Sequence, residues 1–82
     1  MRIDKFLNSV NITKRRSIAQ DMLSNKVVLI NGVTVKPSKN VAVDDIVTIN
    51  YLESSKKYKV LKLPTTKSTP KSLQDEYIKE IL

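Results

Sequence analysis

The chain has 82 residues, no cysteine, no histidine and one glycine, and its formal net charge is +7. This length allows one small domain with a thin core, and the missing residue types exclude a disulfide framework, a thiolate metal site and a histidine general base. No stretch approaches the length of a membrane span and the N-terminus lacks the apolar run of a secretory signal, so we expect a cytoplasmic protein.

The charges are segregated along the chain. Residues 1–40 carry eight basic and two acidic side chains, residues 41–55 carry three acidic ones and no basic one, and residues 56–82 carry seven basic and three acidic ones. The three segments therefore have net charges of +6, −3 and +4. This segregation favours a polyanionic partner over the plainer alternative of a charged surface that only keeps the protein in solution.

Two short helices are predicted before residue 26. In residues 2–10, one apolar face is formed by Ile3, Phe6, Leu7 and Val10. Thr13 is suited to be the N-cap of the second helix, which ends at Asn25-Lys26. The apolar face of the second helix comprises Ile18, Ala19, Met22 and Leu23, and the residues that project away from it are Arg16, Ser17, Gln20 and Ser24.

Three cations, Lys14, Arg15 and Arg16, fall at the predicted start of the second helix. The helix dipole disfavours positive charge there by a few tenths of a kcal/mol for each exposed group. The same helix end attracts phosphate groups. We interpret a feature that opposes local stability as functional.

A β-hairpin follows, because residues 27–30 are rich in β-branched side chains and Asn31-Gly32 is a strong two-residue turn signal. The predicted register pairs residue 30 with 33 and residue 28 with 35. The residues that then share one face are Val28, Ile30, Val33 and Val35.

The remaining elements are a polar connection over residues 36–40, a turn at Asp44-Asp45, a strand over residues 46–51 and a last strand over residues 58–63. The residues of the first of these strands that face the core are predicted to be Val47, Ile49 and Tyr51. Residues 64–71 have the composition of a linker. Thr69-Pro70 begins a C-terminal helix whose apolar residues are Leu73, Tyr77 and Ile81, and docking on the sheet is favoured over fraying or partner binding.

The sequence argues against catalysis. The one glycine excludes a glycine-rich phosphate cradle, and no histidine is present to activate a serine. Asp44-Asp45 is better explained as a turn than as a metal or acid–base pair, and Asp4 and Asp21 as carboxylates that orient arginines. We therefore predict no catalytic residue, no metal site, no cofactor and no small-molecule substrate.

The candidate site is a basic surface made by both helices and the connection after the hairpin. Its cations are Arg2, Lys5, Lys14, Arg15, Arg16, Lys36 and Lys39, and the polar side chains beside them are Ser17, Gln20, Asn31 and Ser38. Arginine suits forked phosphate contacts and lysine supplies point charge. Since no exposed aromatic residue is predicted in this set, we expect recognition of the backbone and shape of structured RNA and no stacking of single-stranded bases.

The runs RIDKFLNSV, TKRRSIAQDML, VVLINGVTVKPSKNV and DDIVTI together resemble the S4-type RNA-binding domain, over about residues 1–51. Among such proteins, the chain is similar to the small stand-alone group of heat shock protein 15 and RqcP-like proteins. The resemblance implies an α+β fold in which two N-terminal helices pack on a small, mostly antiparallel sheet. With the predicted elements added, residues 1–63 form the S4-type domain and residues 64–82 form a linker and a C-terminal helix.

The resemblance also implies rRNA and tRNA as partners, on a large ribosomal subunit that carries stalled peptidyl-tRNA, in ribosome-associated quality control. It carries RNA contact onto Arg2, Lys5, Arg15, Arg16, Ser17, Asn31, Gly32, Lys36, Ser38 and Lys39. The sequence departs from the family pattern where glycine is usual before the first strand, which here is Lys26, and before a later strand, which here is Asp44. We expect a monomer without membrane contact.

Two other functions are compatible with the sequence. A general binder of structured RNA in ribosome assembly or translation regulation would crosslink to precursor rRNA and not to subunits that carry tRNA. A protein–protein adaptor would lose its partner, and keep its RNA affinity, when residues 68–82 are deleted.

Overall fold

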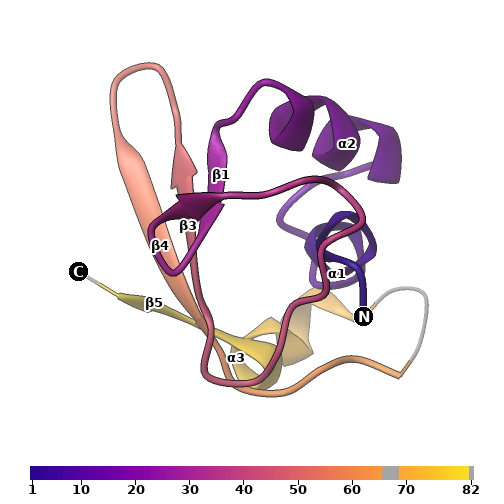
Figure 1. Ribbon diagram of the computed structural model, residues 1–82. Coiled ribbons are helices and arrows are strands. Elements are labelled where there is room, and N and C mark those ends of the chain that lie inside the picture. The colour runs from indigo at the N-terminus through magenta and orange to yellow at the C-terminus, as the bar shows by residue number, and fades with distance from the viewer. Residues whose placement is uncertain (66–68, 82) are drawn as a thin grey trace.

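The computed structural model describes residues 1–65 and 69–81, which form two layers. Helices α1 (Ile3–Ser9) and α2 (Arg16–Ser24) lie on one face of a five-stranded sheet (Figure 1). The strands are β1 (Val28–Ile30), β2 (Val33–Thr34), β3 (Ile46–Asn50), β4 (Ser55–Val60) and β5 (Ile78–Ile81). They follow the order β2-β1-β3-β4-β5 with antiparallel neighbours, so the predicted fold class is confirmed.

The apolar face predicted for the first helix is the centre of the core. Its four residues, Ile3, Phe6, Leu7 and Val10, are fully buried. They belong to one cluster with Ala19 and Leu23 of α2 and with Val28, Val47, Ile49 and Val60 of the sheet. Because α1 has only seven residues, it is too short to be stable alone, and this packing holds it in place.

Helix α2 starts later than the sequence predicted. Its N-cap is Arg15, and Thr13 lies buried ahead of it, so the prediction of Thr13 as the N-cap is wrong. The N–H of Thr13 donates to the Leu7 carbonyl at 3.2 Å, which binds Thr13 to the end of α1, and its hydroxyl donates to the Arg15 carbonyl at 3.2 Å. Consequently Lys14 and Arg15 precede the helix, and only Arg16 lies in its first turn.

Three apolar residues on the predicted apolar faces of the helix, the hairpin and the strand over residues 46–51 are exposed. Ile18 is 41% exposed, Val33 63% and Tyr51 44%. Ile18 lies in the first turn of α2, Val33 lies on the edge strand β2, and Tyr51 follows the last residue of β3. These positions lie at the end or the edge of their elements, where the apolar pattern overestimates burial.

The hairpin was predicted correctly. Ile30 pairs with Val33 across a two-residue turn in which Asn31 has φ 52° and Gly32 has φ 83°. Positive φ at both central residues is the turn geometry that matches the twist of a hairpin, and asparagine and glycine adopt it most readily. A Cβ atom at Gly32 would meet no atom within 4 Å, so this glycine serves the backbone conformation and not a close approach.

The C-terminal segment differs from its prediction. A 3₁₀ turn (Lys71–Leu73) and α3 (Gln74–Tyr77) are present, but the helix does not continue to Ile81, because Ile78–Ile81 form β5 along β4. Pairing satisfies backbone groups of β4 that would otherwise face solvent, and it buries Ile78 opposite Val60. The predicted division after residue 63 stays a prediction, and this pairing is a contact across it.

The segment before β5 is bound to the end of α1, so it is docked on the protein, but the residues that reach the sheet, Ile78–Ile81, do so as a strand and not as the predicted helix. Thr69 is buried and donates both its N–H and its hydroxyl to the Ser9 carbonyl, at 2.9 and 3.0 Å. The Gln74 side chain donates to the Val10 carbonyl at 2.7 Å. None of the helices in residues 1–65 and 69–81 is long and apolar enough to cross a membrane.

Both departures from the glycines of the family pattern fall at strained backbone positions. Lys26 has φ 61° and Asp44 has φ 75°, in the left-handed region that glycine adopts without a steric penalty. Of the two residues Asn25-Lys26 at which the sequence predicted the end of the helix, Asn25 has an ordinary φ of −84°. The left-handed residue is therefore the lysine that follows.

Replacing Lys26 by glycine should stabilise the protein. The left-handed conformation costs an L-residue roughly 1–2 kcal/mol, and the larger chain entropy of glycine offsets part of the gain, so we expect Lys26→Gly to raise the free energy of unfolding by about 0.5–1 kcal/mol. Urea denaturation followed by circular dichroism measures it. Ser24→Gly, two residues earlier in helical backbone, is the control and should destabilise. An unchanged or lower midpoint for Lys26→Gly would contradict the strain.

Candidate nucleic-acid interface

One buried carboxylate gathers side chains from both helices. Asp4, which is fully buried, accepts hydrogen bonds from Arg2 through Nε at 3.2 Å and Nη2 at 3.0 Å. Arg16 approaches the same carboxylate, with its Nε 3.4 Å from Oδ2. A charged fork on a carboxylate fixes orientation as well as position. The expectation that Asp4 orients arginines is thus confirmed, whereas the same expectation for Asp21 is wrong, because its carboxylate forms no ion pair among the described residues.

Two further donors complete the Asp4 site. The Lys5 backbone N–H donates to Oδ1 at 2.7 Å, and the Gln20 side chain donates from Nε2 to Oδ2 at 3.0 Å. Burial alone would raise the pKa of Asp4, but the hydrogen bonds from Gln20, Lys5 and Arg16, with the charge of Arg16, outweigh it and lower the pKa below 3.8. Asp4 is therefore ionised at neutral pH.

The guanidinium groups stay accessible while Asp4 holds them. The side chains of Arg2 and Arg16 are 47% and 44% exposed, whereas that of Asp4 is fully buried. Each arginine has five N–H donors, and Asp4 uses only part of them. This arrangement presents two oriented cations to an external anion from one small area.

The connection over residues 36–40 lies against the start of α1. The Ile3 N–H donates to the Lys39 carbonyl at 2.8 Å, the Asp4 N–H donates to the Pro37 carbonyl at 3.3 Å, and Arg2 and Asn40 form a single antiparallel bridge. These backbone bonds bring the predicted site residues Lys36, Ser38 and Lys39, all exposed, to the same part of the molecule as Arg2.

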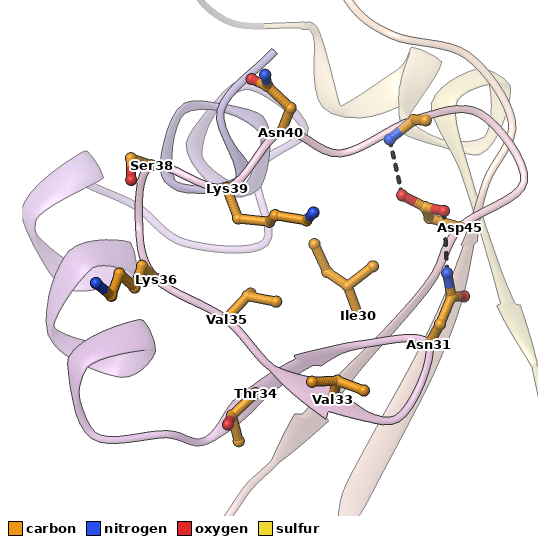
Figure 2. A pocket seen from close by; sticks show the side chains of 11 residues that line it. Ile30, Asn31, Val33, Thr34, Val35, Lys36, Ser38, Lys39, Asn40 and Asp45 are labelled. Carbon is orange, nitrogen blue, oxygen red and sulfur yellow. Dashed lines mark hydrogen bonds between the residues drawn. The ribbon is translucent and has the colours of Figure 1, made fainter.

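A pocket of about 750 Å³ separates this connection from the hairpin (Figure 2). Ile30 and Val35 lie at its floor, and Lys39 extends across it. Lys36 points away from the pocket, toward α2 (Figure 2). The two lysines of the connection therefore serve different parts of the surface.

Asn31, predicted to contact RNA, has its side-chain amide engaged within the protein. Its Nδ2 donates to Asp45 Oδ1 at 3.1 Å, and its Oδ1 accepts from the Ile46 N–H at 3.0 Å. Asp45 in turn accepts from the Ala42 N–H at 2.9 Å, which confirms the predicted turn. Sequence reasoning missed this link between the hairpin and the turn before β3, because nothing local relates residues 31 and 45.

The other predicted contacts are exposed side chains near the start of the two helices. Lys5 lies on α1, Lys14 and Arg15 precede α2, and Ser17 lies in its first turn. The Arg15 backbone is fixed, since its carbonyl accepts from the Thr13 hydroxyl and from the N–H groups of Ile18 and Ala19. These residues extend the positive area around the Asp4 site.

A model of the S4 domain family matches residues 1–47, which hold Asp4, its partners and the connection after the hairpin. The chain belongs to the S4 domain family. This confirms the resemblance on which the sequence interpretation rested, and with it the prediction of an RNA-binding protein.

Similar proteins extend this assignment beyond residue 47. The RQC P-site tRNA stabilizing factor of Helicobacter pylori strain J99 is 44% identical over 78 residues, which cover 95% of this chain and 93% of that protein. The solution structure of hypothetical protein HP1423 has a TM-score of 0.87 at 39% identity and covers 100% of this chain and 98% of its own. Vibrio cholerae heat shock protein 15, solved as a trimer, has a TM-score of 0.89 at 26% identity and covers 99% of this chain and 81% of its own.

The Asp4 site should make stability depend on acid pH. The pKa of Asp4 is lowered in the folded protein, so the ionised carboxylate adds stability above about pH 4. This contribution is lost as the pH falls through the pKa of Asp4 in the folded state. We expect the free energy of unfolding of Asp4→Asn to be lower by about 1–3 kcal/mol at neutral pH and to fall less in acid than that of the wild type. Urea denaturation at pH values between about 7 and 2 measures both.

Asp21→Asn is the matched control, because Asp21 is an exposed carboxylate of α2. It should keep the acid dependence of the wild type. If Asp4→Asn and Asp21→Asn follow the same pH curve, Asp4 does not have the stabilising role described.

Proposed function

We propose that this protein binds rRNA and tRNA on the large ribosomal subunit and acts in ribosome-associated quality control of stalled peptidyl-tRNA. The observation that carries this proposal is the Asp4 site, which aims Arg2 and Arg16 outward beside the connection over residues 36–40. The name of the Helicobacter relative, RQC P-site tRNA stabilizing factor, supports the choice of process. The protein acts by binding and not by catalysis, and its place of action is the cytoplasm.

The helix-side surface comprises the predicted cations Arg2, Lys5, Lys14, Arg15, Arg16, Lys36 and Lys39. None of these residues is aromatic, so bases have no platform on which to stack. Guanidinium and ammonium groups instead bind phosphates, and the A-form backbone presents these with its 2′-hydroxyls across a shallow minor groove. Binding of this kind reads the shape of folded RNA and weakens as salt rises, because it depends on counterion release.

The first-turn amides of α1 are not available to an anion. Ile3 and Asp4 donate their N–H groups to carbonyls of the connection, and Lys5 donates its own to Asp4. Contact with phosphate at this end of α1 therefore depends on side chains. Gln20 and Asn31 also direct donors inward, so we assign them mainly to positioning, with Gly32 as the turn residue.

Two substitutions on the helix-side surface should weaken RNA binding without disturbing the Asp4 site. Lys5 and Lys39 are exposed and their side chains have no ion pair among the described residues. We expect Lys5→Glu combined with Lys39→Glu to weaken binding to large subunits by about tenfold or more and to flatten its salt dependence. Co-sedimentation with purified large subunits over a salt series measures both.

The control is Lys62→Glu combined with Lys56→Glu, which changes the net charge equally at exposed residues of β4 and just beyond it. Equal losses in the two variants would show that only net charge matters and would refute the assigned surface.

Crosslinking in cells separates the proposal from its alternative, because a quality-control factor crosslinks to tRNA and large-subunit rRNA together, whereas an assembly factor crosslinks to precursor rRNA. The expected monomeric state stays a prediction, and sedimentation equilibrium measures it.

A further inference from the structure

The face of the sheet opposite α1 and α2 is not covered by any helix in the described part of the chain (Figure 1). Strand side chains alternate between the two faces of a sheet. Since Tyr58 and Val60 of β4 and Ile78 of β5 are directed to the helix side, the lysines between and beside them are directed to the open side. These residues are Lys57, Lys59 and Lys79.

Two of these lysines are registered directly against each other. Lys59 is the cross-strand partner of Lys79, and Lys57 lies two residues before Lys59 on the same face. Side chains opposite each other in an antiparallel pair have Cβ atoms about 4.5–5.5 Å apart, at which distance like charges repel. The open face therefore concentrates positive charge at a cost in stability.

Acidic groups compensate this charge only in part. Asp44 lies 3.6 Å from the Lys59 ammonium, and its own side chain is 76% exposed, so the pair is a weak one. Among the residues that the structure describes, no carboxylate lies within ion-pair distance of Lys57 or Lys79. Two of the three ammonium groups are thus free to meet an external anion.

Protection of a sheet edge does not explain the cluster. Lysine on an edge strand hinders pairing with other chains, and this accounts for Lys79 on β5. Lys57 and Lys59 belong to β4, which is paired on both sides, so they have no such role.

Beside the lysines, the open face carries hydroxyl groups among apolar side chains, which include Ile46 opposite Lys59. One row across the sheet consists of Thr34, Leu29, Thr48, Lys57 and Ile81. Its hydroxyls can bond sugar and phosphate oxygens beside the ammonium groups. No strand residue directed to this face is aromatic, whereas a protein partner usually needs a buried aromatic or arginine anchor. RNA is therefore favoured over an acidic protein.

We propose that the open sheet face, through Lys57, Lys59 and Lys79, is a second RNA-binding surface that binds the phosphate backbone of a segment separate from the one on the helix-side surface. This inference rests on the proposed RNA-binding function and deepens it. The two surfaces lie on opposite sides of the sheet, so one RNA duplex does not cover both. The protein then joins two RNA segments.

The stoichiometry of RNA binding tests this inference. The full-length protein is titrated at low salt with a short RNA hairpin, well above the dissociation constant, and the number of hairpins bound per protein is measured. Energy transfer between donor- and acceptor-labelled hairpins reports bridging. We expect two hairpins and energy transfer for the wild type, and one hairpin without energy transfer for the combined Lys57→Gln, Lys59→Gln and Lys79→Gln variant.

The matched control combines Lys26→Gln, Lys56→Gln and Lys62→Gln, which removes the same charge from outside both surfaces and should keep two hairpins and the energy transfer. Thermal unfolding verifies that each variant is folded. The inference is overturned if the wild type binds one hairpin, if the sheet-face variant still binds two, or if the control loses its second hairpin equally. It is also overturned if the wild-type protein binds polyglutamate but not RNA through the open sheet face. A failure of the helix-side surface is recognised separately, because Lys5→Glu with Lys39→Glu would then leave both hairpins bound.

Discussion

The buried carboxylate of Asp4 is the interaction on which the candidate interface depends. It lies at the first turn of α1, yet its donors come from residue 2, from α1 itself and from α2. An ionised group without solvent is stable only when donors surround it, so the fold cannot place Asp4 there without also drawing in Arg2 and Arg16. The requirement to satisfy one buried charge thus fixes where two exposed charges point.

Helical and strand periodicity predicted the local elements well, because their determinants are close in sequence. The spacing of Ile3, Phe6 and Leu7, and the Asn31-Gly32 turn, both led to the observed structure. The errors have distant causes. Thr13 is held by α1 and not by the helix it precedes, and Ile78–Ile81 leave the helical pattern because β4 offers an edge to pair with. No window of sequence around these residues contains that information.

The residues of the candidate site could be predicted from the sequence, but their arrangement in space could not. The basic residues were evident from their number and order, and the family resemblance carried RNA contact onto most of them. What the sequence could not show is which polar side chains are already bonded inside the protein. From the sequence, the side chains of Gln20 and Asn31 are expected to be available for contact with RNA. In the structure, the Gln20 amide is bonded to Asp4 and the Asn31 amide is bonded to the turn before β3. Such partners depend on long-range packing of the two layers.

Several cations of this chain occupy positions that weaken the isolated fold. Arg16 lies at the positive end of a helix dipole, Lys59 faces Lys79, and Lys26 has a left-handed backbone. A polyanion that binds the folded state reverses the first two penalties, and at about one hundred times its dissociation constant it adds about 2.7 kcal/mol to stability. For a domain with so thin a core this is a substantial fraction of the whole. The charges that oppose folding alone are then the ones that favour it on RNA, and Lys26, whose strain no ligand relieves, is the exception.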